Sequence, residues 1–245
     1  MRCLIGIDDT DNLESRGTGF RARQLGGRLA EAGLGKVRGI TRHQLFVHPS
    51  IPYTSHNSSA CLDVDLDERR MDDVRDFCRD YLATESADGS DAGLCVVPFD
   101  GIPDEMVEFG RHAKERVLTR EQAVALARRH GAYLEGLTGD HMGVIGALAA
   151  TGLRRGGHDG RFIWLEGVRE LTGRSTAGTL LMTTGIDSVE SIDGRPLPPE
   201  AEVTVDPWPR PVLLHGRAVL LAEACEEENE RSGWRILSKE AIRRY

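Results

Sequence analysis

The sequence contains no hydrophobic run long enough to cross a membrane. Its apolar N-terminal run, Cys3 to Ile7, is far shorter than the roughly 20 residues that a membrane-spanning helix needs. It also lacks the basic start and the small-residue cleavage site of a secretory signal peptide. We therefore expect this run to be a buried strand of a cytoplasmic protein with no membrane partner.

Cysteine pairs, excess basic charge and repeats are also missing. The 5 cysteines are widely spaced and include no C-x-x-C pair, which is typical of reduced thiols and gives no sign of structural zinc. The formal net charge of -8 argues against an extended nucleic-acid-binding surface, because phosphate neutralisation dominates such binding. No G-x-x-x-x-G-K-[ST] sequence occurs, which excludes a Walker phosphate loop.

Three carboxylates follow the first apolar run. Asp8, Asp9 and Asp11 lie within four positions, and such a cluster usually needs a divalent cation to offset its repulsion. Mg²⁺ is the hard cation that couples carboxylates to nucleotide phosphates, so these residues are candidate metal ligands and catalytic residues. The alternative is a polar loop in which the aspartates serve as turn and N-cap residues.

A glycine-bearing turn and a predicted helix come next. The turn contains Gly17, Thr18 and Gly19, and the helix is expected from about Gly19 to Glu31, capped by Thr18 or Ser15. The N-H groups at such a helix start bind phosphate readily, and ATP requires a metal on one side and such donors on the other. Three arginines would stabilise developing charge there: Arg16, Arg21 and Arg23.

The element pattern predicts an α+β fold with two units. Residues 1–115 should contain a ferredoxin-like βαββαβ unit, and residues 116–245 a second α+β unit. The strands expected in the first unit are Arg2 to Asp8, Val37 to Val47, Ala60 to Asp65 and Leu94 to Pro98, with helices at Gly19 to Glu31 and Glu68 to Ala83. Further on, we expect helices at Pro103 to Lys114, Thr119 to His130 and Met142 to Leu153, and strands at Arg161 to Leu165 and Leu180 to Thr184. A strand or a hairpin is expected from Val212 to Ala222, followed by a helical or acidic tail.

Two other segments have an unusual composition. The loop from His48 to Ser59 is rich in hydroxyl and amide groups, and in it Tyr53 could stack on a base while Asn57 supplies hydrogen bonds. The segment from Gly143 to Gly152 is built of glycine, alanine and other apolar residues, which allows a close approach to a ligand or another backbone. A plain polar turn and a tightly packed core helix are the respective alternatives.

Taken in order, three motifs resemble one family. Gly6-Ile7-Asp8-Asp9-Thr10-Asp11, Ile51-Pro52-Tyr53 and Gly143-Val144-Ile145-Gly146-Ala147-Leu148-Ala149-Ala150 are similar to motifs of the archaeal tRNA-isoleucine agmatinylcytidine synthetases, TiaS. This resemblance implies that residues 1–115 form a kinase-like, ATP-binding domain in which the aspartates handle Mg²⁺ and ATP. It also implies that the second α+β unit, residues 116–245, is ferredoxin-like. It also implies that Gly143, Gly146 and the Tyr53 loop line the nucleotide and acceptor cleft.

The chain also departs from that family in ways that affect the expected substrate. It has no zinc-type cysteines, so it resembles a short form without the OB-fold and zinc-ribbon domains that grip tRNA. The family's phosphorylated threonine falls at Phe20. Basic residues of the family motifs are replaced here by Thr54, His56, Asp140, His141 and Met142.

The resulting hypothesis is an ATP-dependent kinase-like or ligase-like enzyme. It would transfer a phosphoryl group, or activate an acceptor for attack by an amine, with His56 or His141 as general base. The acceptor could be a small metabolite or RNA, and the chain could form a homo-oligomer. The alternatives are a non-catalytic protein that binds a nucleotide or another small ligand, and a component of RNA modification.

Overall fold

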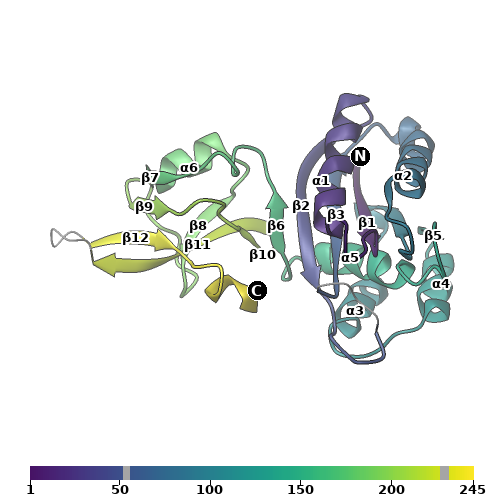
Figure 1. The fold of residues 1–245 in the computed structure, drawn as a ribbon. Coiled ribbons are helices and arrows are strands. Elements are labelled where there is room, and N and C mark those ends of the chain that lie inside the picture. Colours follow the sequence, from purple (N-terminus) through teal and green to yellow (C-terminus); the bar gives the residue numbers. More distant parts are fainter. Residues whose placement is uncertain (52–55, 227–231) are drawn as a thin grey trace. The chain divides into compact units, whose positions relative to one another are not determined.

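The chain folds into two compact units, residues 1–156 and residues 157–245 (Figure 1). The structure is a computed structural model that describes residues 1–51, 56–226 and 232–245. The chain contains helices together with largely antiparallel strands, which confirms the predicted α+β class. No helix in these ranges is long and apolar enough to span a membrane.

The first unit carries an antiparallel sheet in the order β5-β4-β1-β3-β2. Its strands are β1 (Arg2–Asp8), β2 (Lys36–Gln44), β3 (Ser58–Asp65), β4 (Gly93–Pro98) and β5 (Tyr133–Gly136). Its α-helices are α1 (Thr18–Glu31), α2 (Met71–Glu85), α3 (Asp104–His112), α4 (Arg120–Arg129) and α5 (Val144–Gly156). The 3-10 turns η1 (Glu68–Arg70) and η2 (Phe99–Gly101) follow β3 and β4.

Strand β1 occupies the middle of this sheet, as its apolar sequence predicts. Cys3 to Ile7 are buried, and β1 pairs with β3 on one side and β4 on the other. Side chains alternate between the two faces of a strand. Leu4 therefore packs into a cluster with α3, α4 and α5, while Leu62 of β3 contacts Gly26 of α1 on the other face.

Helix α5 lies unusually close to β1, because glycines leave room for its backbone. A Cβ atom on Gly6 would lie 2.0 Å from the carbonyl oxygen of Ala147, and one on Gly152 would lie 2.0 Å from that of Met106 in α3. Any larger residue at these positions would force the backbones apart. Close backbone packing thus accounts for the glycines at positions 6 and 152.

The second unit is mainly β structure. Its sheet runs β6-β10-β11-β12-β9-β7, with β8 parallel to β11. The elements are β6 (Arg161–Trp164), β7 (Gly173–Thr176), α6 (Ala177–Thr183), β8 (Ser188–Ser191), β9 (Glu202–Val205), β10 (Val212–Leu214), β11 (Arg217–Glu226), β12 (Ser232–Ile236) and the 3-10 turn η3 (Ala241–Arg244). Its core contains residues from α6 and from most of these strands, including Phe162, Leu180 and Val203.

Several predictions for this half of the chain are wrong. The segment predicted as a strand from Leu180 to Thr184 lies in α6, because the Thr176 hydroxyl accepts a hydrogen bond from the N-H of Thr179 and starts a helix there. The tail, predicted to be helical or acidic, contains the strand β12 and the 3-10 turn η3. The element order of this unit is also not βαββαβ, so a second ferredoxin-like unit is not what the chain forms.

The division between the units lies after Gly156, not between residues 115 and 116 as predicted from the sequence. Residues 116–156 contribute α4, β5 and α5 to the first unit. Helix α5 covers one face of the first sheet, and β5 extends that sheet beside β4. The burial of α5 against β1 is what ties this segment to the first unit.

Candidate functional site

The three N-terminal aspartates line one pocket at the end of β1. Asp8 is the last residue of β1, and Asp9 has a left-handed backbone conformation with φ of 51°. Few residues other than glycine adopt this conformation, which turns the chain sharply as it leaves the sheet. The turn explains how neighbouring aspartates can face the same pocket even though side chains alternate along a strand.

Asp11 holds the start of α1. Its Oδ1 accepts hydrogen bonds from the Thr18 N-H at 2.9 Å and from the Thr18 hydroxyl at 2.8 Å. The predicted caps do not act in this way, since the N-cap residue is Gly17 and Ser15 instead accepts a bond from the Asn12 N-H. Asp11 thus places a negative charge at the positive end of the α1 dipole, which stabilises the helix.

The start of α5 faces the same aspartates. A Cβ atom on Gly146 would lie 1.8 Å from Asp8 Oδ2, and one on Gly143 would lie 3.0 Å from the Asp8 carbonyl oxygen. These glycines let the Asp8 carboxylate lie against the first turn of α5. Asp11 thus contacts the start of α1, and Asp8 lies against the start of α5. Both helix starts belong to the pocket lining, through Thr18 in α1 and through Gly143 and Gly146 at α5.

The crowded carboxylates hold protons more tightly than isolated ones. Burial, and then the charges of Asp9 and Asp11, raise the pKa of Asp8 to about 8. Burial, and then the charges of Asp91 and Asp11, raise the pKa of Asp9 to about 6. The ionised forms of Asp8 and Asp9 are therefore disfavoured in the protein alone, and a bound cation would favour them.

The other walls of the pocket come from two loops. The loop between β2 and β3 contributes polar residues and Ile51, while the segment after α3 contributes Arg116 beside apolar residues. The lining in these parts consists of Leu45, Ser50, Ile51, His56, Asn57, Ser58, Ala113, Arg116, Val117 and Leu118, with Met142 and Ile145 beside the α5 start. The pocket therefore has an acidic end with two helix termini and a wall that is largely apolar.

The predicted arginines are engaged elsewhere. Arg21 pairs with Glu85 at 2.9 Å, and Arg16 lies over the ring of Phe20 at 4.5 Å. Arg23 donates to the Gly19 carbonyl oxygen. Within the described residues, none of these arginines belongs to the pocket lining, and neither does Gly17 or Gly19.

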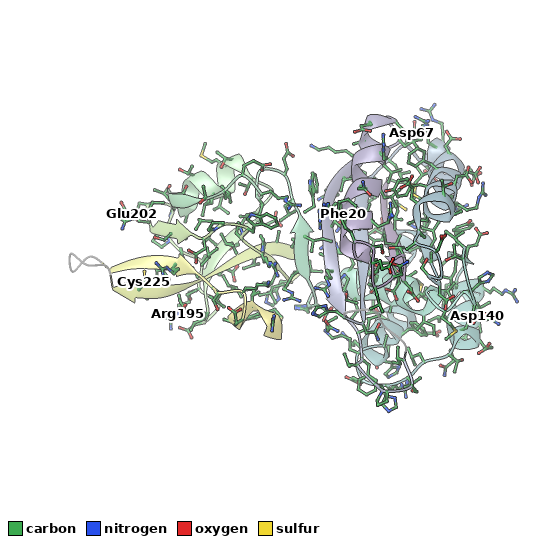
Figure 2. The ribbon with its side chains drawn as sticks, viewed as in Figure 1. Phe20, Asp67, Asp140, Arg195, Glu202 and Cys225 are labelled. Atoms are coloured by element: carbon green, nitrogen blue, oxygen red, sulfur yellow. The ribbon has the colours of Figure 1, made fainter. Side chains whose placement is uncertain are left out.

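The histidines and the aromatic loop were the other predicted site residues. His56 and Asn57 line the pocket, although the Asn57 amide also donates to the Phe46 carbonyl oxygen at 2.6 Å. His141 and Asp140 instead line a neighbouring groove between the start of α4 and the turn before α5, where Figure 2 marks Asp140. Tyr53 lies outside the described residues.

Sequence reasoning missed Arg116 and Asp91. Arg116 is the one lysine or arginine among the described residues that line the pocket. Asp91 lies close enough to Asp9 to raise its pKa, and its carboxylate accepts from the N-H of Asp140. Neither residue belongs to a sequence motif, because each reaches the site only through the packing of distant segments.

No group of three His, Cys, Asp or Glu side chains in residues 1–51, 56–226 and 232–245 is placed to hold a metal ion. Part of the reason is visible at Asp11, whose Oδ1 already accepts two bonds from Thr18. Asp8 and Asp9 remain as carboxylates at the acidic end of the pocket. Mg²⁺ commonly uses one or two carboxylates together with phosphate oxygens and water, so a three-residue cage is not required.

Comparison with solved structures reveals a relative of known activity. Over 62% of its length, this chain is similar in structure to TiaS, a tRNAIle2 agmatidine synthetase. The apo TiaS structure matches with a TM-score of 0.53 and 25% sequence identity. The TiaS complex with its tRNA and ATP matches with a TM-score of 0.54 and 25% sequence identity. The complex with the tRNA, AMPCPP and agmatine matches with a TM-score of 0.52 and 25% sequence identity. The resemblance to TiaS is thus confirmed at the level of structure.

The similarity to TiaS is partial in length. The chain covers 35% of apo TiaS and 50% of an uncharacterized protein of Methanocaldococcus jannaschii, to which it is 29% identical over 157 residues. It therefore spans about a third of TiaS and half of that second relative. No protein-family model matches the chain.

Proposed function

We propose that the first unit binds Mg-ATP in the pocket at the end of β1 and uses it to transfer a phosphoryl group or to activate an acceptor. One observation carries this proposal. Asp8, Asp9 and Asp11 line a single pocket together with the N-terminal ends of α1 and α5. The dipole of a helix favours an anion such as phosphate at the helix start, and carboxylates hold the cation that accompanies a triphosphate.

The residues at the acidic end fit Mg²⁺. Burial raises the pKa values of Asp8 and Asp9, and the charges of neighbouring aspartates raise them further, so a divalent cation would favour the ionised carboxylates. In this proposal Asp8 and Asp9 hold the ion, and Asp11 supports the site through Thr18 at the start of α1. The ion would supply charge neutralisation for the phosphates.

The apolar wall suits a nucleotide base. Leu45, Ile51 and Val117 line the pocket with apolar side chains, as is usual where a ring is bound mainly by burial. His56, which lines the pocket as well, is our candidate for the general base that takes a proton from an acceptor. His141 would serve an acceptor only if that acceptor extends into the neighbouring groove.

Two further points support this assignment. The order β4-β1-β3-β2 with antiparallel neighbours is the order of a ferredoxin-like sheet, so we assign that fold to residues 1–98. TiaS, the structural relative, has been observed with ATP, with AMPCPP, with agmatine and with its tRNA. The acceptor proposed for this chain is accordingly a small molecule or RNA.

Calorimetric titration with Mg-ATP tests the proposal. Asp8→Ala and Asp9→Ala should each weaken binding at least tenfold, whereas Asp67→Ala, which removes an exposed carboxylate outside the pocket, should not. Thermal unfolding of each variant without ligand identifies any general loss of folding. Unchanged Mg-ATP affinity in folded Asp8→Ala and Asp9→Ala proteins would refute the assignment.

A second candidate is a nucleotide-binding protein without turnover. It is favoured by the positions of Arg16, Arg21 and Arg23, which lie outside the pocket lining and so do not supply cations to a transition state there. Incubation with Mg-ATP, with and without candidate amines and RNA, separates the two candidates. Steady release of ADP or AMP supports an enzyme, while saturable binding with no release supports a sensor.

A further inference from the structure

We infer that Arg116 binds the phosphate chain of the nucleotide, and that Glu108 and His112 hold Arg116 in place for this task. This inference rests on the proposed function. Among the described residues that line the pocket, Arg116 is the one cationic side chain. A triphosphate carries more negative charge than one divalent ion neutralises, so a guanidinium in the same pocket has a clear partner.

Arg116 is fixed by a chain of three side chains. Its Nη2 donates to His112 Nδ1 at 2.6 Å, and His112 Nε2 lies 3.0 Å from Glu108 Oε1. A guanidinium has only donors, so His112 Nδ1 must be unprotonated and its proton must be on Nε2, facing Glu108. These contacts determine the tautomer of His112 and the direction of one edge of Arg116.

The backbone around Arg116 is fixed as well. The Arg116 N-H donates to the His112 carbonyl oxygen at 2.9 Å, and the Ala113 carbonyl oxygen accepts from the Phe46 N-H at 2.9 Å. Leu118, two residues further on, is buried in the cluster that contains α5. The guanidinium thus projects from an ordered segment, which lowers the entropic cost of ligand binding.

No second lysine or arginine is found among the described residues that line the pocket. The described polar groups on the remaining walls are hydroxyl, amide and imidazole groups, while the acidic end repels phosphate until a cation binds. Arg116 therefore complements the carboxylates: they receive the cation, and Arg116 receives the anion.

Mg-ATP titrations of four proteins test the role of Arg116. Arg116→Met keeps the apolar stem without the charge and should bind about tenfold more weakly than the parent protein. Arg116→Lys should recover part of the loss. Arg111→Ala is the matched control, since Arg111 is exposed and pairs with Glu108 but does not line the pocket, and it should bind like the parent.

A double-mutant cycle tests the role of His112. His112→Phe should weaken Mg-ATP binding in the parent but should have no further effect in Arg116→Met, because its influence passes through Arg116. Additive losses would overturn the positioning role. Parent-like affinity in Arg116→Met would overturn the inference as a whole while leaving the proposed function intact. A parent protein that binds no Mg-ATP would overturn the proposed function, and this inference with it.

Discussion

Replacing Gly146 with alanine should weaken Mg-ATP binding by displacing Asp8. A Cβ atom at this position would lie 1.8 Å from Asp8 Oδ2, whereas real Cβ contacts under 3.0 Å are essentially never seen. The atom it would meet belongs to a side chain, so the carboxylate can move away while the backbones of β1 and α5 stay in place. The proposed metal site would then lose its geometry before the fold loses its packing.

The expected magnitude follows from that displacement. The contact must lengthen from 1.8 Å to at least 3.0 Å, and a misplacement of about 1 Å can cost on the order of a hundredfold in a positioned site. We therefore expect Mg-ATP affinity to fall between about tenfold and a hundredfold, or about 1.4 to 2.8 kcal/mol. The free energy of unfolding should fall by about 1–3 kcal/mol, as for other overpacked sites.

Calorimetry with Mg-ATP and urea unfolding on the same preparations would measure both effects. Gly27→Ala is the control, since Gly27 lies in α1 with open space around it and outside the pocket. It should leave binding unchanged. If Gly146→Ala bound Mg-ATP as tightly as the parent, Asp8 would not be a positioned ligand and our interpretation of the α5 glycines would be refuted.

Three other predictions follow from the same contacts. Gly6→Ala should lower the unfolding free energy by about 3 kcal/mol or more, because its Cβ would meet the backbone of Ala147, whereas Gly27→Ala should raise it by up to about 1 kcal/mol. If urea unfolding showed Gly6→Ala to be as stable as Gly27→Ala, the close packing of α5 on β1 would be contradicted. At pH 7 the Asp8 carboxyl, with a pKa of about 8, is largely protonated, so Mg²⁺ binding should release close to one proton. Calorimetry in two buffers of different ionisation enthalpy measures this proton release. Binding heats that do not depend on the buffer would count against Asp8 as a ligand. Burial, and then the charge of Arg154, lower the pKa of His43 to about 3, so the stability that neutral His43 contributes is present above about pH 6.5 and is lost as the pH falls toward 3. The unfolding free energy of the parent relative to that of His43→Gln should therefore drop by about 1.4 kcal/mol per pH unit between these pH values. A difference that does not change with pH would refute the lowered pKa of His43.

The first unit was largely predictable because its signals are local. The apolar run of β1 and the periodic apolar residues of α1 gave both elements to within a residue or so of their bounds. By contrast, β5 was missed because its four residues are all half-buried and form a short edge strand with no apolar run. The second unit consists of strands as short as three or four residues, which sequence patterns seldom distinguish from loops.

The acidic residues of the candidate site could be predicted from the sequence, but its basic residue could not. The aspartates are neighbours in the sequence, so their clustering is evident from the order of residues alone. The arginines chosen from the same segment were not at the site, because Arg21 and Arg23 satisfy partners on α1 and α2. The cation that lines the pocket, Arg116, comes from a segment about a hundred residues away, and only the packing of α3 and α5 against the sheet brings it there.

The bond between Asp11 and Thr18 has a consequence for ligand selection. Asp11 is an anion that the protein already supplies at the start of α1, where a phosphate would otherwise bind. A phosphate that reaches the Thr18 N-H must displace this carboxylate, and one charge-assisted hydrogen bond then replaces another. That helix start therefore contributes little net affinity for a free anion. A ligand gains from it only by bringing a cation that gives the displaced Asp11 a new partner, so the site should discriminate Mg-ATP from metal-free ATP or inorganic phosphate.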